Sequence, residues 1–228
     1  MESSGRRASL NSSELARLIK TGILGVDVTE EDVCADIAKA REYPFSAYAV
    51  DLSYLELAKK LLQGTRMLLT AAISYPLGGM TLATKLSQIR FALRVRAEEI
   101  NATLNLGAIK SGDYEAVLAE LRAMVDVAGG AIDVIVIPQF EVLTHSEKLR
   151  TCETLLDAGV RAIKTDGHGG LCQQEDILLV RRTFGRDISI EASGGIRTTQ
   201  QALALLDAGA DFIHTSTAYS VLADIANP

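Results

Sequence analysis

Two eleven-residue segments, fifty positions apart, repeat one pattern along the chain. Residues 155–165 read LLDAGVRAIKT, and residues 205–215 read LLDAGADFIHT. In both copies an amphipathic stretch ends at a glycine that can adopt a positive φ, and an aliphatic segment follows at once. A repeated helix-to-strand unit of this kind predicts a parallel sheet covered by helices.

The same alternation runs along the rest of the chain. Short apolar segments bounded by Gly, Pro or polar residues are typical of buried parallel strands, and they occur at residues 18–24, 46–52, 67–74, 100–106, 131–138, 160–165, 188–193 and 211–216. The first of these segments is the weakest. Eight units in about 215 residues predict a single-domain (β/α)₈ barrel over residues 14–228, after a polar, mobile tail at residues 1–13. A doubly wound open sheet is the alternative, but the first strand is not followed by the GxGxxG of a dinucleotide site.

The expected helices have recognisable ends and faces. Capping-box spacing occurs in three pairs: Thr29 with Asp32, Thr144 with Glu147, and Thr198 with Gln201. Ser53 is expected to cap a helix over residues 54–62. One apolar stripe at helical spacing is formed by Val117, Leu118, Leu121, Met124, Val125 and Ala128.

Composition excludes several classes of function. Lys and Arg number 23 against 29 Asp and Glu, so the net charge of −6 provides no basic face for nucleic acid. No apolar run reaches the ~18 residues of a membrane span, so no membrane partner is expected. Three cysteines (Cys34, Cys152 and Cys172) share no short spacing, which is typical of reduced thiols and indicates a cytoplasmic protein. The scattered histidines form no HExxH pattern, so no metal site is expected.

Lys164 is the most informative residue at the expected active-site face, which in such a barrel lies at the C-terminal ends of the strands. It lies near the end of the strand expected at residues 160–165, where an unpaired ammonium is costly to bury. An ion-paired lysine that closes the barrel and a catalytic amine both fit this position. A desolvated lysine can lose its proton near neutrality and attack a carbonyl group to form a Schiff base.

Two further pairs of residues follow the last two expected strands. Gly194 and Gly195 follow the seventh, and Ser216 and Thr217 follow the eighth. Each pair alone fits an ordinary tight turn. Together they favour a phosphate site, because barrels often bind phosphate between these two loops with backbone N–H groups.

Several segments resemble the deoxyribose-phosphate aldolase family, and the similarity runs from residue 29 to residue 221. The segments are residues 76–79 (PLGG) with Lys85, 105–115 (NLGAIKSGDYE), 163–165 (IKT) and 192–198 (ASGGIRT). The resemblance implies a class I aldolase on a (β/α)₈ barrel, without metal or organic cofactor. It makes Lys164 the imine-forming lysine and implies a phosphate site at Gly194, Gly195, Ser216 and Thr217.

Four positions depart from the family's pattern. Glu191 stands where the family has a second lysine on strand 7, and Asn101 where it has an aspartate on strand 4. Ala49 replaces a cysteine on strand 2, and Lys20 an aspartate on strand 1. The loop after Lys164 is also shorter. The scaffold and nucleophile therefore match the family, whereas the groups that transfer protons differ.

The departures allow opposite interpretations of Glu191. It lies on the strand next to Lys164, so the two are expected to form an ion pair, and a carboxylate within ~4–6 Å raises the pKa of a lysine. The free amine would then be harder to form, as in a barrel that has lost its chemistry. Alternatively, Glu191 acts as a general base after imine formation, with Asp166 or His168 assisting.

The leading hypothesis is a class I aldolase, a carbon–carbon lyase that forms a lysine Schiff base with a small phosphorylated aldehyde or sugar. The default substrate is 2-deoxyribose 5-phosphate. One alternative is an imine-forming enzyme of the same family with a different carbonyl substrate and reaction. Another is a non-catalytic barrel that binds a phosphorylated metabolite. A homodimer or higher homo-oligomer is compatible with all three.

Overall fold

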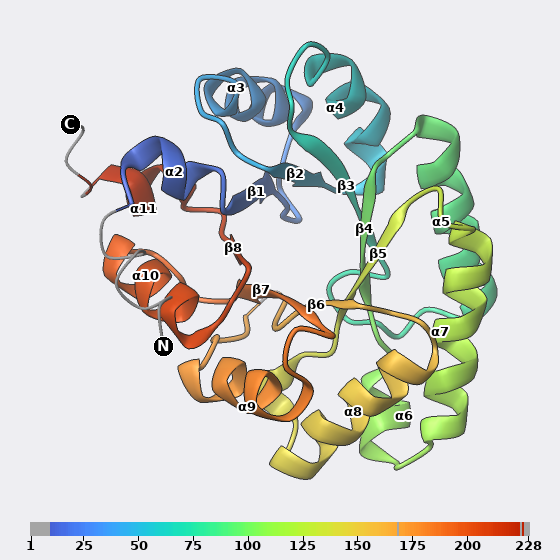
Figure 1. Cartoon of the computed structure of the whole chain (residues 1–228). Coiled ribbons are helices and arrows are strands. Elements are labelled where there is room, and N and C mark those ends of the chain that lie inside the picture. Colours follow the sequence, from blue (N-terminus) through green and yellow to red (C-terminus); the bar gives the residue numbers. More distant parts are fainter. Residues whose placement is uncertain (1–9, 168, 224, 226–228) are drawn as a thin grey trace.

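Eight parallel strands close into a barrel in sequence order in the computed structural model (Figure 1). Strand β1 pairs with both β2 and β8, so the sheet has no free edge. The structure describes residues 10–167, 169–223 and 225. It confirms the predicted (β/α)₈ barrel, and the open doubly wound sheet is excluded because the first and last strands are hydrogen-bonded to each other.

The strands agree closely with the predicted segments. They are β1 (Ile19–Ile23), β2 (Ala47–Val50), β3 (Leu68–Ile73), β4 (Glu99–Thr103), β5 (Asp133–Ile137), β6 (Ala162–Lys164), β7 (Ser189–Ser193) and β8 (Phe212–His214). Only β4 extends beyond its predicted segment, beginning at Glu99 and ending before Asn105. It ends early because the Asn105 side chain accepts the N–H of Ala108 and so begins a helix.

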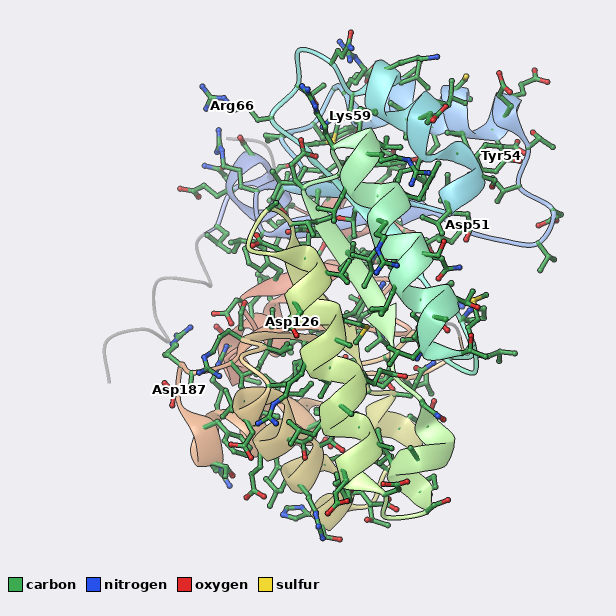
Figure 2. The ribbon with its side chains drawn as sticks, turned by 90° about the vertical axis from the view of Figure 1, so that its right-hand side faces the viewer. Asp51, Tyr54, Lys59, Arg66, Asp126 and Asp187 are labelled. Atoms are coloured by element: carbon green, nitrogen blue, oxygen red, sulfur yellow. The ribbon has the colours of Figure 1, made fainter. Side chains whose placement is uncertain are left out.

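The helices form an outer layer around the strands. They are α2 (Ser12–Ala16), α3 (Glu30–Ala40), α4 (Leu55–Leu61), α5 (Leu82–Val95), α6 (Leu106–Lys110), α7 (Tyr114–Ala128), α8 (His145–Asp157), α9 (Gln174–Phe184), α10 (Thr199–Ala208) and α11 (Ala218–Ala223), with short 3₁₀ turns η1 (Leu52–Tyr54) and η2 (Phe140–Val142). In Figure 2, α5 and α7 face the viewer and cover the strands behind them. Within the described part of the chain, no helix has the length and apolarity needed to cross a bilayer.

Local signals for the helix ends were mostly correct. The capping boxes at Thr29, Thr144 and Thr198 are all confirmed. The predicted Ser53 cap is wrong, because the chain first forms the turn η1, and α4 then begins at Leu55 without a side-chain cap.

Both copies of the repeat have the backbone conformation that their sequence predicts. The glycine after the helical part of each copy has a positive φ, 84° at Gly159 and 118° at Gly209.

Residues 1–9 of the predicted tail lie outside the described residues. Asn11 caps α2, so the end of the predicted tail segment is helical.

The apolar stripe of α7 packs against the barrel as expected. Val117, Leu121, Met124 and Ala128 are buried, whereas Leu118 and Val125 are partly buried against the same core. Glu120 is also buried on this helix, because its carboxylate accepts a hydrogen bond from the fully buried Lys85 at 2.8 Å. The outer core therefore includes one ion pair among its apolar contacts.

Candidate active site

A cavity of about 550 Å³ opens at the C-terminal ends of the strands. Five residues proposed from the sequence line it together: Lys164, Gly194, Gly195, Ser216 and Thr217. They come from β6 and from the loops after β7 and β8, so barrel closure brings the predicted nucleophile and the predicted phosphate loops into one space. Its volume lies within the range of small-molecule sites, roughly 300–1,000 Å³.

Lys164 is buried at the end of β6, with 4% of its surface exposed. Its ammonium forms no hydrogen bond or ion pair with any residue that the structure describes, and Nζ lies 6.0 Å from the centre of the Tyr75 ring. Burial lowers the pKa of Lys164 to about 8; the Glu191 charge opposes this shift and the Lys20 charge adds to it. About a tenth of this amine is therefore unprotonated at pH 7, far more than for an ordinary exposed lysine.

Glu191 does not form the predicted ion pair with Lys164. The two residues are register partners in the β6–β7 ladder, but the Glu191 carboxylate is bound by the ammonium of Lys20. Lys20 reaches across from β1 and also contacts Glu99 on β4 at 2.6 Å. The predicted pair is wrong because a third strand supplies a better-placed cation, and Glu191 does not keep Lys164 fully protonated.

Lys20, Glu99 and Glu191 form a buried charge network inside the barrel. Burial alone would lower the pKa of Lys20, but its contacts with Glu191 and Glu99 raise it above its usual value. Burial raises the pKa of Glu99, although Lys20 opposes this, and Thr70 donates a hydrogen bond to its carboxylate at 2.8 Å. Lys20 and Glu191 stand where the resembled family has an acid and a lysine, respectively. Here the two charges are exchanged between the strands, and an ion pair joins them.

Asn101 is buried on β4, with 2% of its surface exposed. Neither its amide nitrogen nor its amide oxygen has a hydrogen-bond partner among the described residues, and it is not among the residues that line the cavity. An unsatisfied buried amide costs roughly 1–3 kcal/mol. Its catalytic role stays a prediction.

Asp166 lies beside the cavity rather than in its lining. Its Oδ1 accepts the backbone N–H of Glu141 at 2.9 Å, and burial raises its pKa to about 6. This contact fixes the loop after β6 against the loop after β5. The assisting role of Asp166 stays a prediction, and His168 lies outside the described residues. Burial also raises the pKa of the Cys172 thiol to about 11, which agrees with an inert loop residue.

The predicted phosphate loops form one joined surface. Gly194 has φ 116°, and a Cβ there would lie 2.5 Å from the carbonyl oxygen of Gly170. Only glycine fits this turn, because both the backbone conformation and the close approach exclude a side chain. The hydroxyls of Thr215 and Thr217 donate to the Ile196 carbonyl oxygen at 2.7 and 3.0 Å, which ties the β8 loop to the β7 loop.

The cavity lining also includes Tyr75, Arg197 and His214, which were not proposed as site residues from the sequence. Arg197 lies within the quoted ASGGIRT segment and brings a positive charge to the phosphate loops. His214 is the tenth residue of the second repeat copy, and Lys164 is the tenth residue of the first. The repeat itself was thus a signal that His214 also faces the barrel mouth. Among the described residues, no group of three His, Cys, Asp or Glu side chains is arranged to hold a metal ion.

A (β/α)₈ barrel with an unpaired, buried lysine beside a glycine-rich loop has the layout of a Schiff-base lyase. No family model matches the chain. It is 35% identical over 213 residues to the deoxyribose-phosphate aldolase of Geobacillus sp. (strain WCH70), covering 92% of this chain and 95% of that protein. It is 36% identical over 212 residues to the deoxyribose-phosphate aldolase of Methanothermobacter thermautotrophicus, covering 92% and 94%.

Solved structures agree. The deoxyribose phosphate aldolase of Aeropyrum pernix, described as having a unique tetrameric structure, matches with a TM-score of 0.86 and 27% identity, over 93% of this chain and 91% of that one. A structure described as QR15, an aldolase, matches with a TM-score of 0.87 and 26% identity, over 92% and 94%. The chain belongs to the deoxyribose-phosphate aldolase family, as the sequence segments indicated.

Proposed function

We propose that this protein is a class I aldolase that forms an imine between Lys164 and a small phosphorylated carbonyl compound, with 2-deoxyribose 5-phosphate as its substrate. The observation that carries this proposal is the Lys164 amine, which is buried, faces the cavity and has no polar partner among the described residues. The relatives carry the name of this activity. Because the pKa of Lys164 is about 8, the nucleophilic form is available without a second lysine.

The chemistry of such an imine is well defined. The neutral amine attacks the aldehyde carbon, and loss of water gives a neutral imine. A proton from solvent then converts the imine to a cationic iminium, which withdraws electrons from the carbon–carbon bond one atom further along the substrate. Cleavage releases glyceraldehyde 3-phosphate and leaves an enamine on Lys164. Protonation of the enamine and hydrolysis then release acetaldehyde and regenerate the amine.

The phosphate group is proposed to bind at the loops after β7 and β8. Gly194, Gly195, Arg197, Ser216 and Thr217 line one wall of the cavity. The donors proposed for the anion are the N–H groups of the two glycines, the Ser216 hydroxyl and the Arg197 guanidinium, because the Thr217 hydroxyl already donates to the Ile196 carbonyl oxygen. This wall supplies several donors and one positive charge to an anion. A phosphorylated substrate bound there extends its carbonyl end toward Lys164.

The assembly state follows the same family argument. We propose a homo-oligomer, because the Aeropyrum pernix relative is described as tetrameric. Light scattering after size-exclusion chromatography measures the mass in solution. A single 24.4 kDa species at micromolar concentration would contradict the proposal. A cytoplasmic location likewise stays a prediction.

Borohydride trapping followed by peptide mass spectrometry tests the proposed function. Incubation with acetaldehyde or 2-deoxyribose 5-phosphate should give a reduced adduct on Lys164, and Lys164→Ala should abolish both adduct and turnover. Lys110→Ala is the control, because this lysine is half-exposed and paired with Glu147, and it should change neither. An adduct without cleavage of deoxyribose 5-phosphate indicates a different carbonyl substrate. Absence of any adduct across a carbonyl panel from pH 6 to 9 contradicts the aldolase proposal and leaves the non-catalytic barrel.

A further inference from the structure

His214 lies at the end of β8 and lines the same cavity as Lys164. It is buried, with 6% of its surface exposed, and it occupies the position in the second repeat copy that Lys164 occupies in the first. In (β/α)₈ barrels, alternate strands contribute side chains to one interior layer. Strands β6 and β8 are alternate strands, because β7 lies between them. The tilt of the strands offsets the hydrogen-bond register by about one residue per strand, so the Lys164 amine and the His214 imidazole lie at one level of the barrel.

The inner edge of the imidazole faces Glu191. His214 Nδ1 lies 3.7 Å from Glu191 Oε2, and neither atom has a hydrogen-bond partner among the described residues. This distance is longer than a hydrogen bond, but the negative charge of the carboxylate favours the tautomer that carries its proton on Nδ1, the nitrogen facing Glu191. That tautomer leaves the lone pair on Nε2, the other ring nitrogen.

Glu191 can orient the imidazole but cannot itself serve the substrate. Its other carboxylate oxygen is bound by Lys20, only 1% of the residue is exposed, and it does not line the cavity. Burial would raise the pKa of Glu191, but its contacts with His214 and Lys20 lower the pKa, so the carboxylate stays ionised. Glu191, which the sequence suggested as a general base, is therefore separated from the cavity, whereas His214 lines it.

Resting on the imine mechanism proposed above, we propose that His214 is the catalytic acid–base residue of this barrel and that Glu191 is its positioning residue. In the cleavage step, Nε2 takes the proton of the substrate hydroxyl as that oxygen becomes the carbonyl of the departing aldehyde. The carbon–carbon bonding pair moves into the iminium and forms the neutral enamine. The imidazolium then returns the same proton to the enamine carbon, which restores both the iminium and the neutral histidine.

The charge state of His214 suits this role. Burial, reinforced by the Lys164 charge, lowers the pKa of His214 to about 4, so the ring is neutral and can accept a proton at neutral pH. The iminium carries the same positive charge as the lysine it replaces, so the ring remains neutral when the imine forms. Once C–C cleavage has discharged the iminium, the imidazolium faces the Glu191 carboxylate without a competing cation on Lys164.

His214→Asn tests the inference, because an asparagine NH₂ can still donate to Glu191 while Nε2 is removed. Borohydride adduct yield should stay within about twofold of wild type, while cleavage of deoxyribose 5-phosphate falls roughly 10²–10⁴-fold, the usual contribution of a general acid–base group. Exchange of the acetaldehyde methyl protons in D₂O, catalysed through the enamine, should fall in parallel. His145→Asn, at the exposed first residue of α8, is the matched control and should leave all three measurements unchanged.

The two proposals fail in different ways. A His214→Asn protein that traps adduct and retains cleavage and exchange within about threefold of wild type overturns the role of His214. A wild-type protein that traps nothing contradicts the imine mechanism instead. If His214→Asn does not fold, His214→Ala replaces it, and added imidazole should restore methyl-proton exchange at least tenfold. Absence of restoration in a folded, adduct-forming His214→Ala protein also overturns the role.

Discussion

Burial, rather than a neighbouring amine, gives Lys164 its reactivity. The family's second lysine position holds Glu191, a change that by itself would raise the pKa of Lys164. The desolvation of an ammonium at the end of a three-residue strand outweighs that charge, because Glu191 is already neutralised by Lys20. The effect of Glu191 on β7 is thus offset by Lys20 on β1, a strand far from β7 in the sequence.

Adduct formation should therefore depend on pH in a defined way. The pKa of Lys164 is lowered to about 8, so the free-amine fraction and the initial rate of acetaldehyde adduct formation should rise with pH through a midpoint near 8 and level off above about pH 9. Because Glu191 raises the pKa of Lys164, Glu191→Gln should move this midpoint to lower pH. Timed borohydride quenches between pH 6 and 10 measure both curves. A rate that still rises beyond pH 10, as for an ordinary lysine, would contradict the lowered pKa.

At the scale of elements, the loops after β7 and β8 act as one unit. Two threonine hydroxyls from the β8 loop are bound to the Ile196 carbonyl oxygen of the β7 loop, and the Gly194 turn packs on Gly170 of a third loop. The wall that we propose binds phosphate is consequently held in place by these contacts before substrate binds. Preorganised donors cost little entropy on binding, so this wall should determine affinity for the anion.

A negative charge on this wall should weaken phosphorylated substrates selectively. Ser216→Asp introduces a carboxylate at an exposed lining position without the positive φ that makes Gly195 substitutions strained. We expect KM for deoxyribose 5-phosphate to rise roughly 10- to 100-fold, since each tenfold corresponds to about 1.4 kcal/mol of repulsion and lost hydrogen bonding. Trapping of acetaldehyde, which has no phosphate, should not change. Ser146→Asp on α8 is the control, and an equal KM in all three proteins would place the phosphate elsewhere.

For the whole molecule, the charge network ties together strands that are far apart in the sequence. Lys20 on β1 contacts Glu99 on β4 and Glu191 on β7, and Thr70 on β3 extends the network to a fourth strand. Removing one partner of a buried ion pair costs several kcal/mol, because an uncompensated charge remains inside. The network therefore couples opposite sides of the barrel.

Lys20→Met should be strongly destabilising for this reason. We expect the free energy of unfolding to fall by about 3–5 kcal/mol, since Glu99 and Glu191 would then face each other without a cation. Lys59→Met is the control: Lys59 lies on the outer surface (Figure 2), is partly exposed and pairs with Glu98, and its loss should cost at most about 1 kcal/mol. Urea denaturation at pH 7 measures both. Similar losses in the two variants would show that the buried network contributes no special stability.

The sequence by itself determined the elements and their order. These elements depend on interactions within a few residues, so they can be recognised from the sequence without tertiary contacts. The local signals are the repeat at residues 155–165 and 205–215, the capping boxes and the short apolar segments. Barrel closure then follows from eight such units, and it brings Lys164 into one cavity with the glycine and threonine loops. Ser53 failed as a cap because a 3₁₀ turn shifted the helix start, a local competition that spacing does not resolve.

Only the tertiary structure decided which charged groups meet. Register neighbours such as Lys164 and Glu191 were predictable from strand order, but the partner of Glu191 is Lys20, which comes from β1 and crosses the barrel interior. The contact between His214 and Glu191 and the unpaired amide of Asn101 depend in the same way on distances across the barrel. Those distances depend on how the closed sheet staggers its strands and on which long side chains fill its interior. Neither quantity is encoded in the spacing of residues along one strand.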